Sequence, residues 1–490
     1  MRNFTQLFFL LAAYVLPIGA QAQSLQNNYS PLSSYYPSKA YMKGICAGYD
    51  SIYHSTDFSK NDESRNFKNS MEGIKKQIYS ITEDSALMHN DVITNYLRKM
   101  TQHIKDNNIV LKDRKLQVFT YRTSNCNASS YGNGIIFFNL NLLASFKSEA
   151  SVAFILCHEI SHDLKGHLVR EVSRNYKIVN DPLVKRQYAL AKHQQFNKYK
   201  SYENYVAITL QKINSKNRED EVQADSLGLI LYRNAGYDLK YAYETIERLD
   251  SMDNLQYSGK IDYPKYFSSD AQPFKNSWLE PEEQEETIGG GNLENAKYPD
   301  SLKTHPDCKY RLKMLQTMNI PFTPAKTGVS GFDSVKTIAE FEMLKVYIED
   351  SELSKGFYNC LHLLGRYPGN QYIKANVVEY LYDVYTLKKN HYLSTMVDTP
   401  DPKYIAAYNE ILYFLNNVSP DACRTMMTEF FRANFNESIS DPYVAYVYLL
   451  VKSIDKSTES KETMVKQYET DFGKNDYYRL LNQRLLKKTS

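Results

Sequence analysis

Hydrophobic and polar positions along the chain first predict two short strands followed by a buried helix. Residues 116–121 alternate between apolar and polar side chains and are rich in β-forming types, and the apolar run 135–138 follows a turn rich in serine and asparagine. From Ser148, which can cap a helix N-terminus, apolar side chains occupy almost every face of the helical pattern up to Ile160. A helix that is apolar all round is buried, so we expect this helix at the centre of a domain.

Downstream of this helix the pattern is helical again. Charged, amphipathic sequence fills about residues 168–216, and a further helix is expected from about Arg218 to Ala235, where Gly236 ends it. Residues 251–300 then contain several prolines, an acidic run and three consecutive glycines. This composition predicts a long loop, either a mobile flap or a disordered surface insertion.

After about residue 330 the pattern stays helical to the end of the sequence. The apolar periodicities of 338–347 and 353–364, followed by a Tyr-Pro-Gly-Asn stop at 367–370, resemble a tetratricopeptide helix pair. A clean second copy of this period is not evident, so an irregular helical domain is the alternative.

The first residues predict an export signal. Arg2 provides a positive start, an apolar run covers residues 8–16, and Ala20-Gln21-Ala22 matches the small-x-small pattern of a signal-peptidase site. A retained membrane anchor is the alternative, although the apolar run is short for a bilayer. We therefore expect an exported chain, periplasmic or secreted, that starts near residue 23 and has no membrane span after it.

Size and charge narrow the classes of partner. A length of 490 residues predicts two or three domains. The formal net charge is +3 and no Lys/Arg cluster forms a stripe, which argues against nucleic acid as a partner. Six cysteines are present, and their pairing cannot be read from their spacing.

The buried helix carries a pattern that predicts a zinc site. His158 and His162 are four residues apart, so both imidazoles lie on one helix face and can hold one ion. Glu159 follows the first histidine and can take a proton from water at the metal. Burying two histidines and a carboxylate without a partner would be costly, which favours a metal site over a chance match.

Catalytic zinc needs a third protein ligand and an open position for water. One zincin pattern places a third histidine six residues after the second, but that position is Leu168. We expect His167 to face elsewhere, as a neighbouring polar group. The better candidate is Glu221, with Asp225 on the same helical face to accept a hydrogen bond from a ligand histidine.

These motifs resemble the CAAX-prenyl-protease/HtpX-like gluzincin metallopeptidases. The resemblance covers about residues 85–320 and is carried by His158-Glu159-Ile160-Ser161-His162, Glu221-Val222-Gln223-Ala224-Asp225, and Thr304-His305-Pro306 with Arg311. Asn127-Ala128 followed by Gly134-Ile135 is similar to the family's element before the catalytic helix.

The resemblance implies a role for each of these residues. His158, His162 and Glu221 would bind one zinc ion per chain, with Glu159 as the general base. His305 and Arg311 would lie beside the active site and support the oxyanion or regulate access. The substrate-binding residues would be Asn127, Ala128, Gly134 and Ile135, and the strand from Gly134 to Phe138 would be an edge with which an extended peptide pairs.

The sequence thus predicts an α+β, mainly helical protein. We expect a signal peptide at 1–22, a zincin-type peptidase domain with a small sheet at 23–330, and an all-α, tetratricopeptide-like domain at 331–490. The resemblance to the soluble exported branch implies an envelope endopeptidase that acts on exported or misfolded proteins, with possible envelope protein partners for the C-terminal helices. The alternative is an envelope chaperone or assembly factor whose zinc site is latent.

Overall fold

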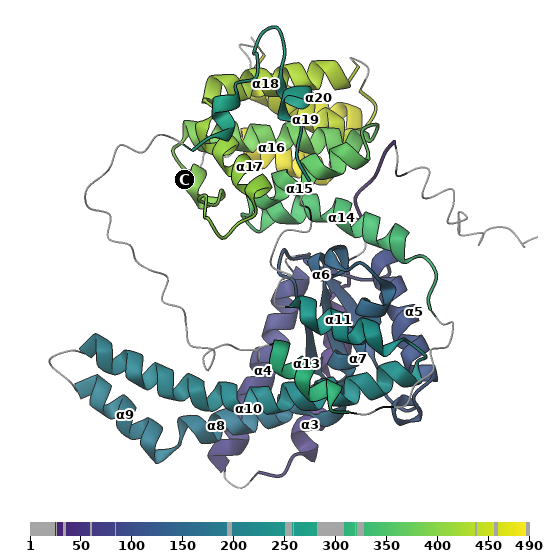
Figure 1. The fold of residues 1–490 in the computed structure, drawn as a ribbon, viewed down its shortest axis with the longest axis vertical. Coiled ribbons are helices and arrows are strands. Elements are labelled where there is room, and N and C mark those ends of the chain that lie inside the picture. Colours follow the sequence, from purple (N-terminus) through teal and green to yellow (C-terminus); the bar gives the residue numbers. More distant parts are fainter. Residues whose placement is uncertain are drawn as a thin grey trace, which may run out of the picture. The chain divides into compact units, whose positions relative to one another are not determined.

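The computed structural model (Figure 1) describes residues 25, 27–32, 36–58, 61–83, 85–193, 198–249, 257, 259–281, 308–318, 320, 328–436, 439–454 and 459–486. The expected signal peptide and His305 lie outside these residues. The chain divides into two compact units. The sheet unit comprises residues 32–258 and 281–352, and the helical unit comprises residues 1–31, 259–280 and 353–490.

Four short strands form the sheet. They are β1 (Leu87–Met88), β2 (Gln117–Tyr121), β3 (Ala128–Gly132) and β4 (Ile135–Asn139), in the order β1-β2-β4-β3. β2 and β4 are parallel, and the other two pairs are antiparallel. Both expected strands are present, whereas β3 lies in sequence expected to be a polar turn.

The position of β4 contradicts one expectation. β4 pairs with β2 on one side and with β3 on the other, so it is an interior strand and not an edge. Its side chains are all buried, as an interior strand between covering elements requires. Among the described residues β3 is the edge strand on this side of the sheet, and its polar sequence suits that position.

Helices surround this sheet. In chain order they are α2 (Lys39–Cys46), α3 (Gly48–Ser55), α4 (Asn61–Glu83), α5 (Val92–Asp106), η1 (Ile109–Leu111), α6 (Leu140–Ser145), α7 (Glu149–Lys165), α8 (His167–Val179), α9 (Pro182–His193), α10 (Lys198–Asn234), α11 (Leu239–Leu249), α13 (Cys308–Gln316) and α14 (Phe332–Glu349). α9 and α10 form a long pair that projects from the rest of the unit (Figure 1). None of the helices described is both long and apolar enough to cross a bilayer.

α7 is the central buried helix that the apolar pattern predicted. Ser148 caps it by accepting a hydrogen bond from the Ser151 amide, and Gly166 ends it in the left-handed conformation at φ 61°. α10 packs closely against it at Gly228, where a Cβ atom would come within 3.2 Å of the His158 backbone. The absence of a side chain there lets α10 approach the histidine-bearing face of α7.

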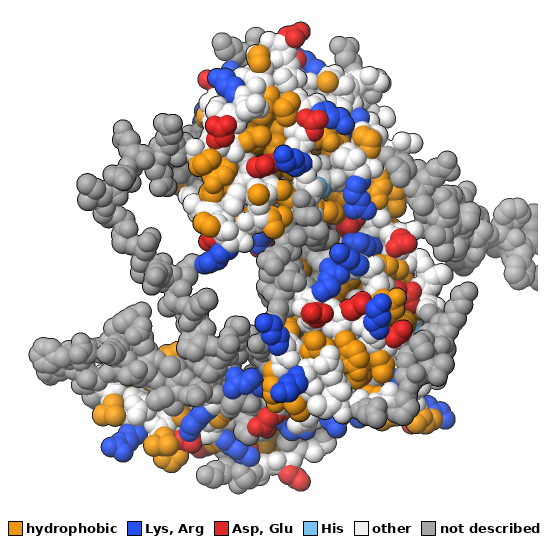
Figure 2. Space-filling model, in the orientation of Figure 1, with side chains coloured by type: hydrophobic (Ala, Val, Ile, Leu, Met, Phe, Trp, Pro, Cys, Tyr) orange, Lys and Arg blue, Asp and Glu red, His pale blue; other side chains and the backbone are white. Residues whose placement is uncertain are grey.

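The helical unit contains α12 (Tyr263–Phe267), η2 (Asn276–Leu279), α15 (Leu353–Arg366), α16 (Gln371–Lys389), η4 (Leu393–Thr395), α17 (Ala406–Asn417), α18 (Pro420–Asn434), α19 (Pro442–Ile454), α20 (Lys461–Phe472) and α21 (Asp476–Leu485). Its visible face carries apolar side chains interspersed with basic and acidic ones (Figure 2). The described cysteines of both units are free thiols, and all except the half-buried Cys126 are buried.

Part of the expected long loop is ordered structure in this unit. Phe267 of α12 stacks on Phe414 with ring centroids 5.5 Å apart, and Trp278 of η2 is buried. The Asn417 amide donates a hydrogen bond of 2.7 Å to the Glu280 carbonyl. Aromatic burial therefore holds residues 259–280, which the proline spacing had suggested were a loop. Residues 282–307 lie outside the described residues.

Before the C-terminal helices, the chain passes from the sheet unit to the helical unit between residues 352 and 353, whereas the expected boundary lay between residues 330 and 331. α14 belongs to the sheet unit because its buried Glu342 forms an ion pair with Arg122, and Lys336 donates to the Ala144 carbonyl. The expected helix pair of α14 and α15 is thus divided between the units. The tetratricopeptide interpretation of the later helices stays a prediction.

Candidate metal centre

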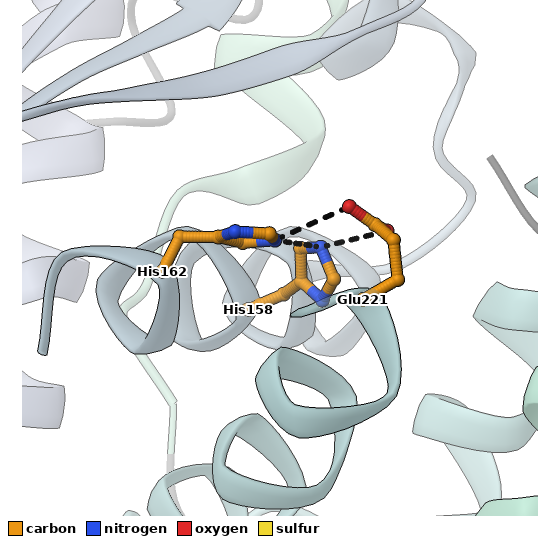
Figure 3. Close-up of side chains that lie close together, drawn as sticks. All are labelled: His158, His162 and Glu221. Atoms are coloured by element: carbon orange, nitrogen blue, oxygen red, sulfur yellow. Dashed lines mark hydrogen bonds and ion pairs between the residues drawn. The ribbon is translucent and has the colours of Figure 1, made fainter. Parts of the chain in front are cut away.

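Two helices bring the expected ligands together. α7 carries His158 and His162 one turn apart, and α10 carries Glu221 opposite them (Figure 3). The Nε2 atoms of the two histidines are 3.0 Å apart. Glu221 Oε2 lies 3.5 Å from His158 Nε2, and Glu221 Oε1 lies 3.4 Å from His162 Nε2.

This triangle of donor atoms fits a zinc ion. Two ligands bound at about 2.0–2.1 Å to a tetrahedral ion lie roughly 3.3–3.4 Å from one another. The two Nε2 atoms are 3.0 Å apart, and each lies 3.4–3.5 Å from a different oxygen of the Glu221 carboxylate, so one ion can reach all three side chains with little movement. Two imidazoles and one carboxylate are also the donor set of a common class of catalytic zinc site.

Asp225 supports the first histidine from one turn further along α10. Its Oδ1 lies 2.9 Å from His158 Nδ1, the ring nitrogen that faces away from the other ligands. Burial disfavours a charged His158, but Asp225 and Glu221 outweigh it and raise the pKa of His158 to about 10. The same negative field attracts a divalent cation, which would compete with the proton for this ring.

Arg311 of α13 is paired with this carboxylate. Its Nε donates to Asp225 Oδ2 at 2.7 Å and its Nη2 donates to Asp225 Oδ1 at 2.6 Å. Its Nη1 lies 3.6 Å from Glu221 Oε2, and its side chain is only 5% exposed. Burial raises the pKa of Asp225, but Arg311 and His158 outweigh burial and the pKa is lowered. The expected catalytic role of Arg311 therefore gives way to a positioning role, because its donors already hold Asp225.

Glu159, the candidate general base, lies next to a proposed metal ligand in the sequence. Glu159 follows His158 directly on α7 and is 7% exposed, although its residue type alone would favour water. A buried carboxylate beside a ligand histidine is suited to proton transfer. His305, expected beside the active site, lies outside the described residues.

The expected substrate-binding residues separate into two groups. Ala128 begins the edge strand β3, whereas Asn127 leads into it with its N–H donating to the Asn125 carbonyl and its own carbonyl accepting from the Asn139 amide. Gly134 does not lie on an edge: its N–H donates to Asp163 Oδ1 at 2.8 Å and its carbonyl accepts from Gln117 at 2.7 Å. Ile135 pairs across β4 with strands on both sides, so neither residue has backbone groups for a peptide.

Gly134 instead shapes the turn between β3 and β4. Its φ is +73°, and a Cβ atom would lie 1.9 Å from the Lys115 carbonyl oxygen. Only glycine fits this approach, which explains the residue without a substrate. The turn borders a cavity of about 500 Å³, which is lined by the turn, the start of α8 and His162. This volume lies within the range of about 300–1,000 Å³ that is typical of ligand sites. This cavity is an opening beside the proposed metal ligands.

Sequence reasoning missed one residue of this centre. His167 Nδ1 lies 2.8 Å from His162 Nδ1, although His167 had been expected to face elsewhere. That expectation continued α7 as a straight helix, whereas the turn at Gly166 starts a new helix and redirects the ring. Glycine is the usual residue just past the end of a helix, so Gly166 could have indicated the turn. Burial and the neighbouring His162 lower the pKa of His167 to about 4.

Comparisons with known proteins point to one family. The sequence model for peptidase family M48 matches residues 93–319. The chain is 26% identical over 210 residues to the mitochondrial metalloendopeptidase OMA1 of Arabidopsis thaliana. This similarity covers 39% of the chain and 31% of that relative, so the match spans about a third of the relative's length. The region matched by the family model contains both metal-ligand helices.

Proposed function

We propose that the protein, whose residues 93–319 match the sequence model for peptidase family M48, is a zinc-dependent metalloendopeptidase. The observation that carries this proposal is the triangle of His158, His162 and Glu221, with all three donor atoms within 4.8 Å of one another. The family match and the relative named as a metalloendopeptidase support the same class of enzyme.

The chemistry follows from the positions of these residues. Zinc held by these residues would supply a Lewis acid for the scissile carbonyl and would lower the pKa of a water molecule toward neutrality. Glu159 takes the proton of the attacking water and delivers it to the leaving amine. His158 and His162 would hold the ion through their Nε2 atoms, while Asp225 and Arg311 keep the first ring in place.

An extended peptide adds to the edge strand β3 in this proposal. The Asn139 amide donates to the Asn127 carbonyl, and the register pairs Ala128 with Phe138 and Ser130 with Ile136. In an antiparallel ladder with this phase, the N–H and C=O groups of Ala128 and Ser130 point away from β4. These groups are therefore the ones that bind substrate backbone, which makes sequence preference broad.

We also propose that the enzyme works in the cell envelope on exported or misfolded proteins. The support is the export signal expected in the first residues and the polar, mixed surface of the helical unit. The helical unit then selects or holds client proteins for the sheet unit. The broad backbone recognition at β3 suits clients that have no common sequence.

Replacing Glu159 by glutamine tests the proposal. Glu159→Gln should bind one zinc per chain like the wild type, and casein cleavage should fall to background because the amide cannot take a proton. The exposed Glu247→Gln on α11 is the matched control and should cleave normally. Normal cleavage by Glu159→Gln would refute the assigned base. A zinc-loaded wild type that cleaves nothing would instead favour the chaperone alternative.

A further inference from the structure

The two ligand histidines are supported by different partners on their outer nitrogens. His158 Nδ1 faces the carboxylate of Asp225 at 2.9 Å. His162 Nδ1 faces the imidazole of His167 at 2.8 Å. A histidine that binds metal through Nε2 carries its proton on Nδ1 and needs an acceptor for it. Asp225 is an anionic acceptor, whereas a histidine can accept only when its facing nitrogen carries no proton.

The surroundings of His167 favour that acceptor form. With Nδ1 unprotonated, its proton sits on Nε2, which lies 3.7 Å from Asp220 Oδ1, an electrostatic contact longer than a hydrogen bond. Asp220 is itself held by two cations of α8, with Arg174 Nη1 2.8 Å from its Oδ2 and Arg170 Nη2 3.3 Å from its Oδ1. His167 and Asp220 are 5% and 6% exposed, so little water competes for these groups.

The backbone explains how His167 reaches this position. His162 and His167 are five residues apart, and on a straight helix their side chains would point roughly 140° away from each other at 100° per residue. Gly166 ends α7 in the left-handed region at φ 61°, and α8 begins with His167. The ring centroids of His162 and His167 then lie 4.6 Å apart with nearly perpendicular planes.

We propose that His167, oriented by Asp220, is a positioning residue that fixes the tautomer and ring angle of the metal ligand His162. This inference rests on the proposed zinc site and names the element that completes it. The second ligand is thus supported by a neutral ring from α8 and the first by a carboxylate from α10. A neutral acceptor stabilises an N–H group less than a carboxylate does. The ring of His162 is therefore held in place less firmly than the ring of His158.

Three variants of the full chain test the proposal by zinc affinity, which needs no catalytic activity. His167→Ala removes the acceptor. His167→Asn places an amide oxygen near the former Nδ1 position and keeps an acceptor. His54→Ala removes an exposed histidine of α3 and is the control. Zinc dissociation constants are measured by competition with a chromophoric chelator, after circular dichroism shows that each zinc-free variant retains its helix content.

We expect His167→Ala to bind zinc about 10- to 100-fold more weakly than the wild type, as losses of outer-shell partners do. His167→Asn should recover most of this affinity, and His54→Ala should match the wild type. With Co²⁺ in place of zinc, the visible absorption bands should change in His167→Ala and return in His167→Asn, because these bands report ligand geometry.

Two results would overturn the proposal. One is a His167→Ala protein with intact helix content, wild-type zinc affinity and an unchanged Co²⁺ spectrum. The other is a His167→Asn protein as impaired as His167→Ala, because a mere packing role would explain that result. A wild type that binds no zinc would refute the proposed function itself, so failure of the two proposals can be told apart.

Discussion

Arg311 donates two hydrogen bonds to Asp225, at 2.7 and 2.6 Å, across 86 positions of the chain. The same carboxylate lies 2.9 Å from His158 Nδ1, so α13, α10 and α7 are joined at one buried carboxylate. Arg311 therefore reaches the metal centre in two ways, through Asp225 to His158 and directly at Glu221, whose Oε2 lies 3.6 Å from the guanidinium. The planar guanidinium suits this task because its fork matches a carboxylate in two-point contact.

Replacing Arg311 by methionine should destabilise the sheet unit. The substitution keeps the volume but leaves Asp225 buried without its cation, and breaking a buried pair in this way costs about 3–5 kcal/mol. Urea denaturation monitored by circular dichroism measures the loss. Arg114→Met removes an exposed arginine and should change the free energy of unfolding by less than about 0.5 kcal/mol. Equal stability of the two variants would show that the pair contributes little.

The ligand set could be predicted from the sequence because helical spacing is local. Histidines four residues apart share a helix face, as do Glu221 and Asp225, and the structure brings these groups together. The partner of Arg311 could not be read in this way, since Asp225 is distant in sequence and many carboxylates were available. Sequence similarity marked Arg311 as near the centre but could not indicate which atoms it contacts.

The sequence led to a wrong prediction of which strand forms the edge of the sheet. β4 is strongly apolar and β3 is polar, so β4 was recognised as a strand and taken for the edge. A strand's hydrophobicity reports how much it is buried, and a fully buried strand is more typical of a sheet interior. The polar β3 was hidden because serine-rich sequence is also typical of turns.

Removing zinc should destabilise one unit and leave the other unchanged. All three proposed ligands lie in the sheet unit, whereas Trp278, the single tryptophan, is buried in the helical unit. At a zinc concentration a thousandfold above the dissociation constant, binding stabilises the folded form by about 4 kcal/mol. A chelator should therefore lower the thermal midpoint seen by circular dichroism and leave the transition seen by tryptophan fluorescence in place.

A shift of the fluorescence transition by the same amount would contradict this prediction, because it would mean that the two units unfold together. Glu221→Ala provides the internal control. Without its carboxylate ligand the sheet unit should melt at the same temperature with and without chelator.

Blocking one edge amide of β3 should weaken substrate binding and spare the metal. Ser130→Pro removes an N–H that points away from β4, and its loss should lower kcat/KM about three- to tenfold, the equivalent of one backbone hydrogen bond. Ser130→Ala loses the same hydroxyl but keeps the N–H, so it should cleave casein normally. Zinc content should be equal in both variants.

Ser129→Pro tests which backbone groups of β3 bond to β4 and which point away from it. The register pairs Ser129 with Phe137 in the hydrogen-bonded phase of the β3–β4 ladder. Proline at 129 removes a ladder bond and should lower the thermal midpoint of the sheet unit more than Ser130→Pro does. If Ser130→Pro proves the more destabilising of the two, the assigned direction of the edge groups is wrong.

His362 should make the helical unit less stable in mild acid. Burial lowers the pKa of His362 on α15 from 6.5 to about 4. Between these two values the unfolded chain binds a proton that the folded chain does not, so the free energy of unfolding falls as the pH drops from 6.5 toward 4. Above pH 6.5 both forms are neutral and the histidine adds no pH dependence. Urea midpoints followed by Trp278 fluorescence at pH 7 and pH 5 measure this loss.

His362→Leu removes the titrating ring while keeping an apolar side chain against Tyr358, whose ring lies 4.5 Å from that of His362. The variant should therefore lose less stability than the wild type between pH 7 and pH 5. His54→Leu, an exposed change in the sheet unit, should leave the fluorescence-detected pH dependence unchanged. Because carboxylates titrate in both proteins alike, only the difference between the two curves reports His362. If the wild type loses no more stability between pH 7 and pH 5 than His362→Leu does, the folded protein accommodates the charged ring.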